Sequence, residues 1–264
     1  MSVRLSNRPE IQGVTLAMRA LHRLDGAFHF RRHALRNRVP ILTLAFDDIP
    51  DSAAAVGAPL MEAAGVRGTF YVSSSLVGRE TPLWRHADAA GIAGLVARGH
   101  EIGLHSHHHV PVAHLGPRGF AGDLDRARTE LARLVPQARL ENYALPFGFT
   151  APYHRPCLAR HTRSCRTTHP GINAGTADPY RILSHALGQG RRDDAYVTGL
   201  LDQAVAATGW LVLTLHDVAP QPSPYGCTGA TLALAIAAAR ARGMEILTMS
   251  DALDLCGLPE RVPA

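Results

Sequence analysis

Short apolar runs alternate with helix-forming segments along the chain after residue 39, and this alternation constrains the fold more than any other feature. Apolar runs bounded by turn residues predict strands. These runs lie at residues 40–46, 68–72, 101–104, 141–145, 211–215 and 245–249. Strands that alternate with helices pair in parallel, so we expect an α/β fold with its ligands at the carboxyl ends of the strands.

Helical periodicity fills the segments between these strands. The clearest helix carries Phe120, Leu124 and Leu131 on one face, with Asp123 and Glu130 on its other faces. Gly, Pro, His and Arg are frequent after this helix and predict long loops with one short strand. These loops are expected at residues 146–192 and their short strand at 165–168. Further helices are expected at residues 59–64, 92–98, 194–207 and 228–242.

Reactive side chains directly follow several predicted strands. Asp47 and Asp48 end the first strand, and His216 follows the strand at 211–215. His105 opens the run His-Ser-His-His-His after the strand at 101–104. Because the carboxyl ends of parallel strands share one edge of the sheet, we expect these side chains to meet there.

The histidine run predicts a metal site. Two imidazoles four residues apart can turn to one side of a short segment, and a carboxylate from another strand completes a three-ligand site with open positions. The alternative is an adventitious histidine tract without a ligand role. Five histidines between residues 105 and 114, next to an acidic pair, favour the metal site.

Such a centre suits the hydrolysis of an amide or an ester, because a bound metal polarises a carbonyl group. One carboxylate of the Asp47–Asp48 pair can bind the metal while its neighbour takes a proton from the attacking water. His216 can protonate the leaving nitrogen, although His216 and Asp217 could equally form a buried hydrogen-bonded pair. A backbone N–H in the Pro146-Phe147-Gly148 turn could stabilise the oxyanion.

Together the motifs resemble those of the polysaccharide deacetylases with a NodB homology domain, also called carbohydrate esterase family four. The family motif T-F-D-D is similar to Ala45-Phe46-Asp47-Asp48, and H-[ST]-x-x-H is similar to residues 105–109. The segments PLMEAAGVRGTFYV and YALPFG and the strand end LTLH also resemble family sequences, so that the likeness spans about residues 39–255. It implies an α/β fold, a distorted (β/α) barrel of about seven parallel strands.

The resemblance also implies a role for individual residues. Asp47 is the expected base and His216 the expected acid. The expected ligands of one divalent metal ion, most often Zn²⁺, are Asp48, His105 and His109. The backbone of Phe147 is expected to bind the oxyanion, and substrate contacts are expected from Pro146, Phe147, Leu215 and Arg181.

Two departures from the family pattern concern the groups that support the base and the acid. Ala144 stands where the third motif often has an arginine that orients the base, and Arg181 is the expected substitute. The fourth motif, whose Asp and Trp support the acid, is not recognisable, so the sequence leaves the partner of His216 open.

Positive charge is concentrated in residues 1–38, which contain eight arginines and two acidic residues, Glu10 and Asp25. Ile11, Val14, Met18 and Leu21 recur at helical spacing and predict an amphipathic helix. This helix either packs on the main domain with solvated arginines or binds a membrane surface. The expected organisation is a basic segment at 1–38 and a catalytic domain at 39–264.

The expected location is cytoplasmic, with peripheral association to the inner membrane as a further possibility. The apolar run near Val14 is too short for a transmembrane span and does not have the features of a signal peptide. Four scattered cysteines suit a reducing compartment. Nucleic-acid binding is not expected, because no aromatic-basic interleaving accompanies the arginines.

The leading hypothesis is a metal-dependent hydrolase that removes N-acetyl groups from N-acetylhexosamine units. Its expected partner is an N-acetylated carbohydrate: a bacterial exopolysaccharide, an adhesin polysaccharide or a lipid-linked oligosaccharide precursor. One alternative is an amidase or cyclic-imide hydrolase that acts on a small non-sugar metabolite. The other is a catalytically silent carbohydrate-binding protein.

Overall fold

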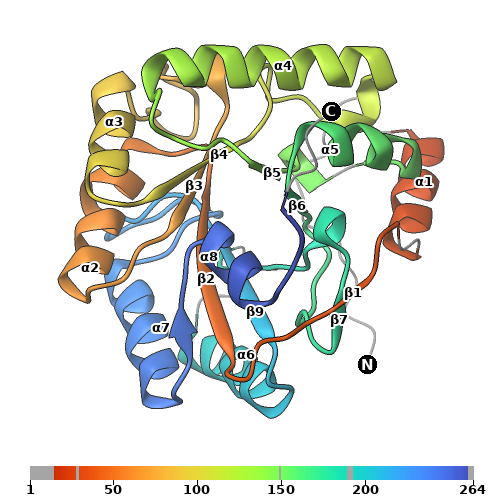
Figure 1. Cartoon of the computed structure of the whole chain (residues 1–264). Coiled ribbons are helices and arrows are strands. Elements are labelled where there is room, and N and C mark those ends of the chain that lie inside the picture. Colours follow the sequence, from red (N-terminus) through yellow and green to blue (C-terminus); the bar gives the residue numbers. More distant parts are fainter. Residues whose placement is uncertain (1–14, 28–29, 149, 189–192, 261–264) are drawn as a thin grey trace.

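The computed structural model describes residues 15–27, 30–148, 150–188 and 193–260. Its main feature is a parallel sheet in the strand order β6-β5-β4-β3-β2-β9-β8, with β10 pairing β2 as an additional strand. The sheet curls into an incomplete barrel (Figure 1), so the expected distorted barrel of about seven parallel strands is confirmed. The strands are β2 (Ile41–Asp47), β3 (Thr69–Val72), β4 (Glu101–Leu104), β5 (Asn142–Ala144), β6 (Ser164–Arg166), β8 (His185–Ala186), β9 (Trp210–Leu215) and β10 (Glu245–Ile246).

Helices surround this barrel (Figure 1). Short 3-10 turns and one π-helical turn connect several of them to the strands. The α-helices are α1 (Leu16–Ala27), α2 (Ala58–Ala63), α3 (Ala89–Ala97), α4 (Pro117–Leu134), α5 (Arg155–His161), α6 (Asp194–Ala206), α7 (Gly229–Ala241) and α8 (Met249–Leu255). The turns are η1 (Ala53–Gly57, π-helical), η2 (Ser74–Leu76), η3 (Val112–His114), η4 (Pro146–Gly148), η5 (Pro152–His154) and η6 (Pro179–Arg181), and β1 (His33–Ala34) pairs antiparallel with β7 (Thr176–Ala177).

Alternation along the strands separates two hydrophobic clusters. Leu44 and Phe46 of β2 belong to the outer cluster, between the sheet and the helices. Ile41 and Ala45 of the same strand belong to the inner cluster, with Val212 of β9. Because successive side chains point to opposite faces of a sheet, the next inward position of β2 after Ala45 is Asp47. The barrel interior therefore leads directly to the polar residues at the carboxyl ends of the strands.

The amino-terminal end of the barrel is closed by α8. Residues 245–249 were expected to form one strand, but β10 ends at Ile246 and α8 begins at Met249. The helix starts early because Thr248 caps it, accepting the Asp251 N–H through its side chain. The Met249 N–H then donates to Thr69 Oγ1 at 2.8 Å, at the first residue of β3. With this end closed, the carboxyl ends of the strands are left as the place for a site.

Part of the segment at 1–38 packs on the barrel. Asp25 of α1 is fully buried, and its carboxylate pairs with the buried guanidinium of Arg155 at 2.7 Å. Ile11 and Val14, two of the four residues that predicted the amphipathic helix, lie outside the described residues. No described helix combines the length and the apolarity that crossing a bilayer requires.

Candidate metal centre

A sharp turn after β2 separates the side chains of Asp47 and Asp48. Asp48 and Ile49 both have positive φ angles, 62° and 45°, which are rare for residues other than glycine and costly for a β-branched one. Two hydrogen bonds hold this turn: the His86 ring Nδ1 lies 2.7 Å from the Asp48 carbonyl oxygen, and the Ala87 N–H donates to the Ile49 oxygen at 2.9 Å. As a result Asp47 contacts a residue of the barrel interior, while Asp48 faces the histidine run.

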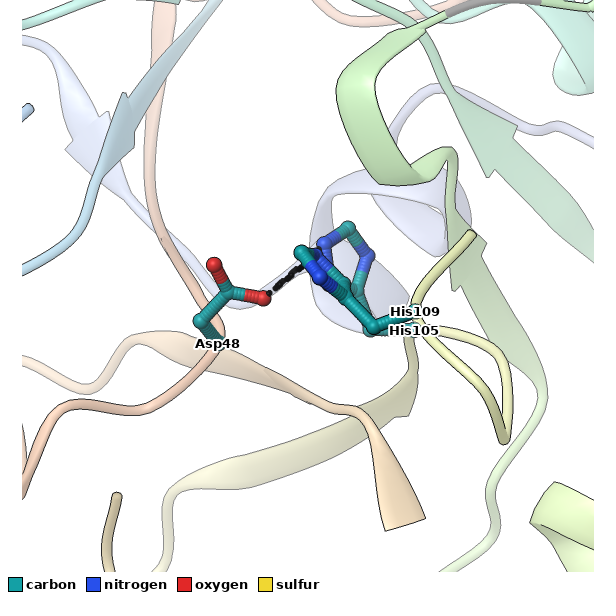
Figure 2. Close-up of side chains that lie close together, drawn as sticks. All are labelled: Asp48, His105 and His109. Atoms are coloured by element: carbon teal, nitrogen blue, oxygen red, sulfur yellow. Dashed lines mark ion pairs between the residues drawn. The ribbon is translucent and has the colours of Figure 1, made fainter. Parts of the chain in front are cut away.

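The histidine run turns back on itself so that its first and last rings face Asp48 (Figure 2). Ser106 and His109 have positive φ angles of 68° and 51°, and Ser106 Oγ accepts the His109 N–H at 2.9 Å. His109 Nε2 lies 2.8 Å from Asp48 Oδ1, and His105 Nε2 lies 3.5 Å from the same oxygen. The spacing of four residues therefore brings both imidazoles to one side, as the sequence predicted.

These three side chains could hold a divalent metal ion. Each offers one ligand atom, and the three atoms lie within 4.8 Å of one another. His105 Nδ1 lies 2.9 Å from the Ala144 carbonyl oxygen, so this nitrogen carries the proton and Nε2 presents its lone pair to the cluster. Two imidazole nitrogens and one carboxylate oxygen form a donor set that suits hydrolytic zinc sites with open positions.

The ionisation of the cluster also suits a cation. Burial by itself would raise the pKa of Asp48, but the charges of His109, His105 and His216 outweigh it and the pKa is lowered. Burial lowers the pKa of His105 to about 4, so this ring is neutral at neutral pH. Burial opposes protonation of His109 as well, but the Asp48 carboxylate raises its pKa. A metal would thus meet an ionised carboxylate and a neutral imidazole, and would displace a proton from His109.

The two middle histidines of the run bind α4 instead. Asp123 accepts the backbone N–H groups of His107 and His108, at 2.9 and 3.1 Å, and lies 2.6 Å from His108 Nδ1. His107 Nδ1 lies 2.9 Å from Glu130 Oε2. The periodicity of α4 placed Asp123 away from its apolar face, yet this carboxylate is 4% exposed because it fills the inside of the histidine loop. Asp123 therefore holds the loop that carries the two candidate ligands.

An arginine on β6, Arg166, holds Asp47. Arg166 Nη2 lies 2.6 Å from each carboxylate oxygen of Asp47, and both side chains are buried. The sequence interpretation chose Arg181 for this role, and the structure has Arg166 there instead. Arg166 on β6 pairs in register with Ala144 on β5. Ala144 is the position where the family motif often has its arginine, so here the guanidinium comes from the neighbouring strand.

The barrel interior is shaped around this arginine. The Arg166 guanidinium carbon lies 5.5 Å from the centre of the Tyr71 ring. Gly103 leaves room for that ring, because a Cβ atom at this position would lie 2.5 Å from two of the Tyr71 ring carbons.

Arg181, the arginine expected at Asp47, has other charged neighbours. Burial and the charge of Arg155 lower the pKa of Arg181, and the charges of Asp25 and Asp178 partly offset this effect.

His216 lies close enough to the cluster for its charge to lower the pKa of Asp48, and aromatic rings flank it. Its ring centroid is 5.6 Å from that of Trp84 and 5.7 Å from that of Tyr225. Asp217 does not support it, since the Asp217 carboxylate accepts hydrogen bonds from the Ser223 N–H at 2.7 Å and from the Ser223 hydroxyl. The sequence did not indicate either aromatic residue, because neither belongs to a motif and Trp84 lies far from His216 in the chain.

Two of the expected substrate contacts, Pro146 and Phe147, lie beside the candidate ligands. Phe147 has a positive φ of 55°, and its ring is 4.7 Å from that of His109. Its side chain is 40% exposed, whereas Pro146 is buried. The segment thus forms a rim of the candidate site on the side of the histidine run.

Leu215, in contrast, does not line the site. Its side chain is fully buried in the outer cluster, between the sheet and the helices, because strand alternation turns it away from the interior. The substrate contact expected from Leu215 stays a prediction, and the burial of this side chain does not support it. The inward neighbour of His216 on β9 is Thr214, whose hydroxyl lies 3.1 Å from Ser184 Oγ.

Comparisons with known proteins agree with this fold. A family model described as polysaccharide deacetylase matches residues 35–162, and a search of curated proteins returned no match. A solved structure described as T48 deacetylase with substrate has a TM-score of 0.61 at 13% identity, covering 86% of this chain and 96% of that chain. A family 4 acetyl xylan esterase from Clostridium thermocellum with a cobalt ion has a TM-score of 0.54 at 23% identity, covering 83% and 93%. A carbohydrate esterase family 4 pseudoenzyme from Bacillus anthracis has a TM-score of 0.59 at 13% identity, covering 83% and 67%. At these identities the structural likeness shows a shared fold.

Proposed function

We propose that the chain, which matches the polysaccharide deacetylase family model over residues 35–162, is a metal-dependent hydrolase that removes N-acetyl groups from N-acetylhexosamine units. The observation that carries the proposal is the convergence of three candidate ligands beside a second, arginine-bound carboxylate and opposite a histidine. In this proposal Asp48, His105 and His109 hold one divalent ion, for which Zn²⁺ fits the mixed nitrogen and oxygen donors. Such an ion supplies a Lewis acid that polarises the acetyl carbonyl and makes water easier to deprotonate.

Asp47 is the proposed base. It adjoins the ligand Asp48 but turns to the other side, so it can accept the proton of the attacking water without leaving the barrel wall. The buried guanidinium of Arg166 binds both oxygens of this carboxylate and fixes its orientation.

His216 is the proposed acid, and its proton goes to the departing nitrogen. An amide nitrogen leaves poorly as an anion, so the group that faces it must supply a proton. The charge of His216 contributes to the lowered pKa of Asp48, which supports a position facing the same centre. The backbone N–H of Phe147 is the proposed donor to the oxyanion, since this residue lies against His109.

For the substrate we propose an N-acetylated polysaccharide, either an exopolysaccharide or adhesin polysaccharide or its lipid-linked oligosaccharide precursor. Aromatic side chains support a sugar ligand: Trp84 and Tyr225 flank His216, and Phe147 lies exposed near His109. Flat apolar rings with polar neighbours are typical of sites that bind rings of mixed polarity.

Acetate release tests the proposal. The zinc-loaded chain is incubated with N-acetylglucosamine oligomers, acetylated xylan and a cyclic ureide, and acetate or ring opening is measured. We expect acetate from the oligomers. Turnover of the ureide alone would support the amidase alternative, and acetate from xylan alone would make the protein an esterase. No turnover together with no bound metal would support a silent carbohydrate-binding protein.

Two variants separate the proposed base from the proposed ligands. Asp48→Ala should lose metal and activity together, because one of three ligands is missing. Asp47→Asn should keep the metal but lose at least about 100-fold in kcat, the range expected for a missing base. Near-normal turnover by Asp47→Asn would contradict the assignment of the base.

A further inference from the structure

The helix α1 has an apolar stripe that faces away from the rest of the molecule. Leu16, Ala20 and Leu24 are spaced four residues apart, so they lie along one side of the helix. Leu16 is 86% exposed and Leu24 is 59% exposed, and Ala20 is exposed between them. α1 lies at the periphery of the molecule in Figure 1. Two leucines this exposed on one helix face are unusual for a helix that is docked on its own domain.

The opposite face of α1 holds the helix in place. The Asp25 carboxylate accepts hydrogen bonds from Nε and Nη2 of Arg155, both at 2.7 Å, and both side chains are fully buried. Met18 and Leu21 lie on this inner half of the helix and are partly buried. These two residues belong to the predicted apolar face, for which the sequence left open packing on the domain or membrane binding, and in the structure this face turns toward the domain. The stripe is thus a separate, second face.

Arginines border the exposed stripe. Arg19 and Arg23 are exposed and follow Leu16 and Ala20 by three residues, which places them along its edge. Asp25 adds no negative charge to this surface, because it is buried and paired with Arg155.

We infer that the outer face of α1 is a docking surface for an anionic lipid bilayer. The exposed leucines would enter the boundary between headgroups and acyl chains, and the arginines would bind the anionic headgroups. The positive charge favours a bilayer over a second copy of the chain, because two copies of this positively charged face would repel each other. Because a buried ion pair ties α1 to the barrel, docking would orient the whole domain on the membrane. The inference goes beyond the proposed deacetylation and does not depend on it.

Vesicle flotation of the full chain tests this inference. We expect the chain to float with vesicles of phosphatidylglycerol and phosphatidylcholine at low salt, and to remain at the bottom with phosphatidylcholine alone. Raising the salt concentration should release it, since screening weakens the arginine contacts. The double variant L16S/L24S should bind at least about tenfold more weakly, and R19Q/R23Q about tenfold more weakly.

Matched variants elsewhere provide the controls. L255S removes another exposed leucine, which is 42% exposed on α8, and R133Q/R139Q removes two other exposed arginines. Both controls should float like the wild type. Absence of flotation by the wild type, or equal flotation of L16S/L24S, would overturn the inference. It would also be overturned if light scattering showed a dimer that L16S/L24S converts to a monomer.

Discussion

The two sides of the candidate site are held by different forces. On one side, charged groups are fixed by hydrogen bonds: Asp47 by Arg166, and the histidine loop by Asp123. On the other side, His216 is held by packing against Trp84 and Tyr225. Charge networks fix atoms to within tenths of an ångström and are costly to break, whereas aromatic packing tolerates small changes of shape. The charged side is therefore expected to be the more sensitive to substitution.

The largest effect is expected at Arg166. Arg166→Met leaves the Asp47 carboxylate buried without its partner, which should lower the free energy of unfolding by about 3–5 kcal/mol. The kcat for acetate release should fall at least about 100-fold, because the proposed base loses its orientation. Chemical denaturation and single-turnover assays measure the two effects.

Two further variants sharpen this result. Arg166→Lys keeps a positive charge and should recover part of the activity, while Arg181→Met leaves the contact of Asp47 with Arg166 intact and should lower kcat much less. If Arg181→Met were the more damaging of the two methionine variants, the pairing of Asp47 with Arg166 would not be what the reaction needs.

Asp123→Ala should weaken metal binding by about 10–100-fold, as expected for a residue that orients ligands without touching the metal. The reason is that two backbone N–H groups of the histidine loop lose their acceptor. Titration with Zn²⁺ in competition with a chelating dye measures the affinity. Asp125→Ala is the control, since this side chain is 61% exposed and pairs with His161 instead. Equal affinities of both variants would show that α4 does not hold the loop.

A smaller effect is expected from Trp84→Ala. His216 would lose one of the two rings that hold it, so kcat should fall about tenfold while the affinity for Zn²⁺ stays unchanged. Trp84→Phe keeps a ring in place and should retain most of the activity. A parallel loss of metal affinity in Trp84→Ala would mean that the two sides of the site are not independent.

The smallest effect concerns the metal-free protein. Its His109 has a pKa raised by Asp48 above the ordinary 6.5, so protonation stabilises the folded state. This contribution is fully present below the unfolded pKa and is lost as the pH rises through the folded pKa. The metal-free chain should thus gain less from His109 at about pH 9 than at about pH 6, and His109→Ala should remove this part of the difference in melting temperature. An unchanged difference in His109→Ala would contradict the assignment.

The sequence predicted that the three candidate ligands meet, because the signals for them are local. The His105 to His109 spacing and the Asp47–Asp48 pair lie within single segments next to strands, so periodicity and strand order were enough to bring them together. The aromatic side was not predicted, because Trp84 and Tyr225 come from separate loops and only the fold brings them to His216.

Strand alternation explains the remaining differences. It turns Leu215 into the outer cluster, and it places Arg166 inward beside Ala144 on the neighbouring strand. Both positions can be predicted once the register of the strands is known. The register depends on how separate strands pair, and the sequence of one strand does not show this.

The sequence by itself determined the alternation of strands and helices, the parallel barrel and the identity of three candidate ligands, because these depend on local patterns and strand order. The tertiary structure alone decided that Arg166 binds Asp47, that Trp84 and Tyr225 hold His216, and which face of α1 is free. Apart from the contact of Tyr225 with His216, nine residues earlier, each of these depends on contacts between segments distant in the chain. Local periodicity shows that a helix or strand has two faces, but only the packing of the whole chain decides which face is buried.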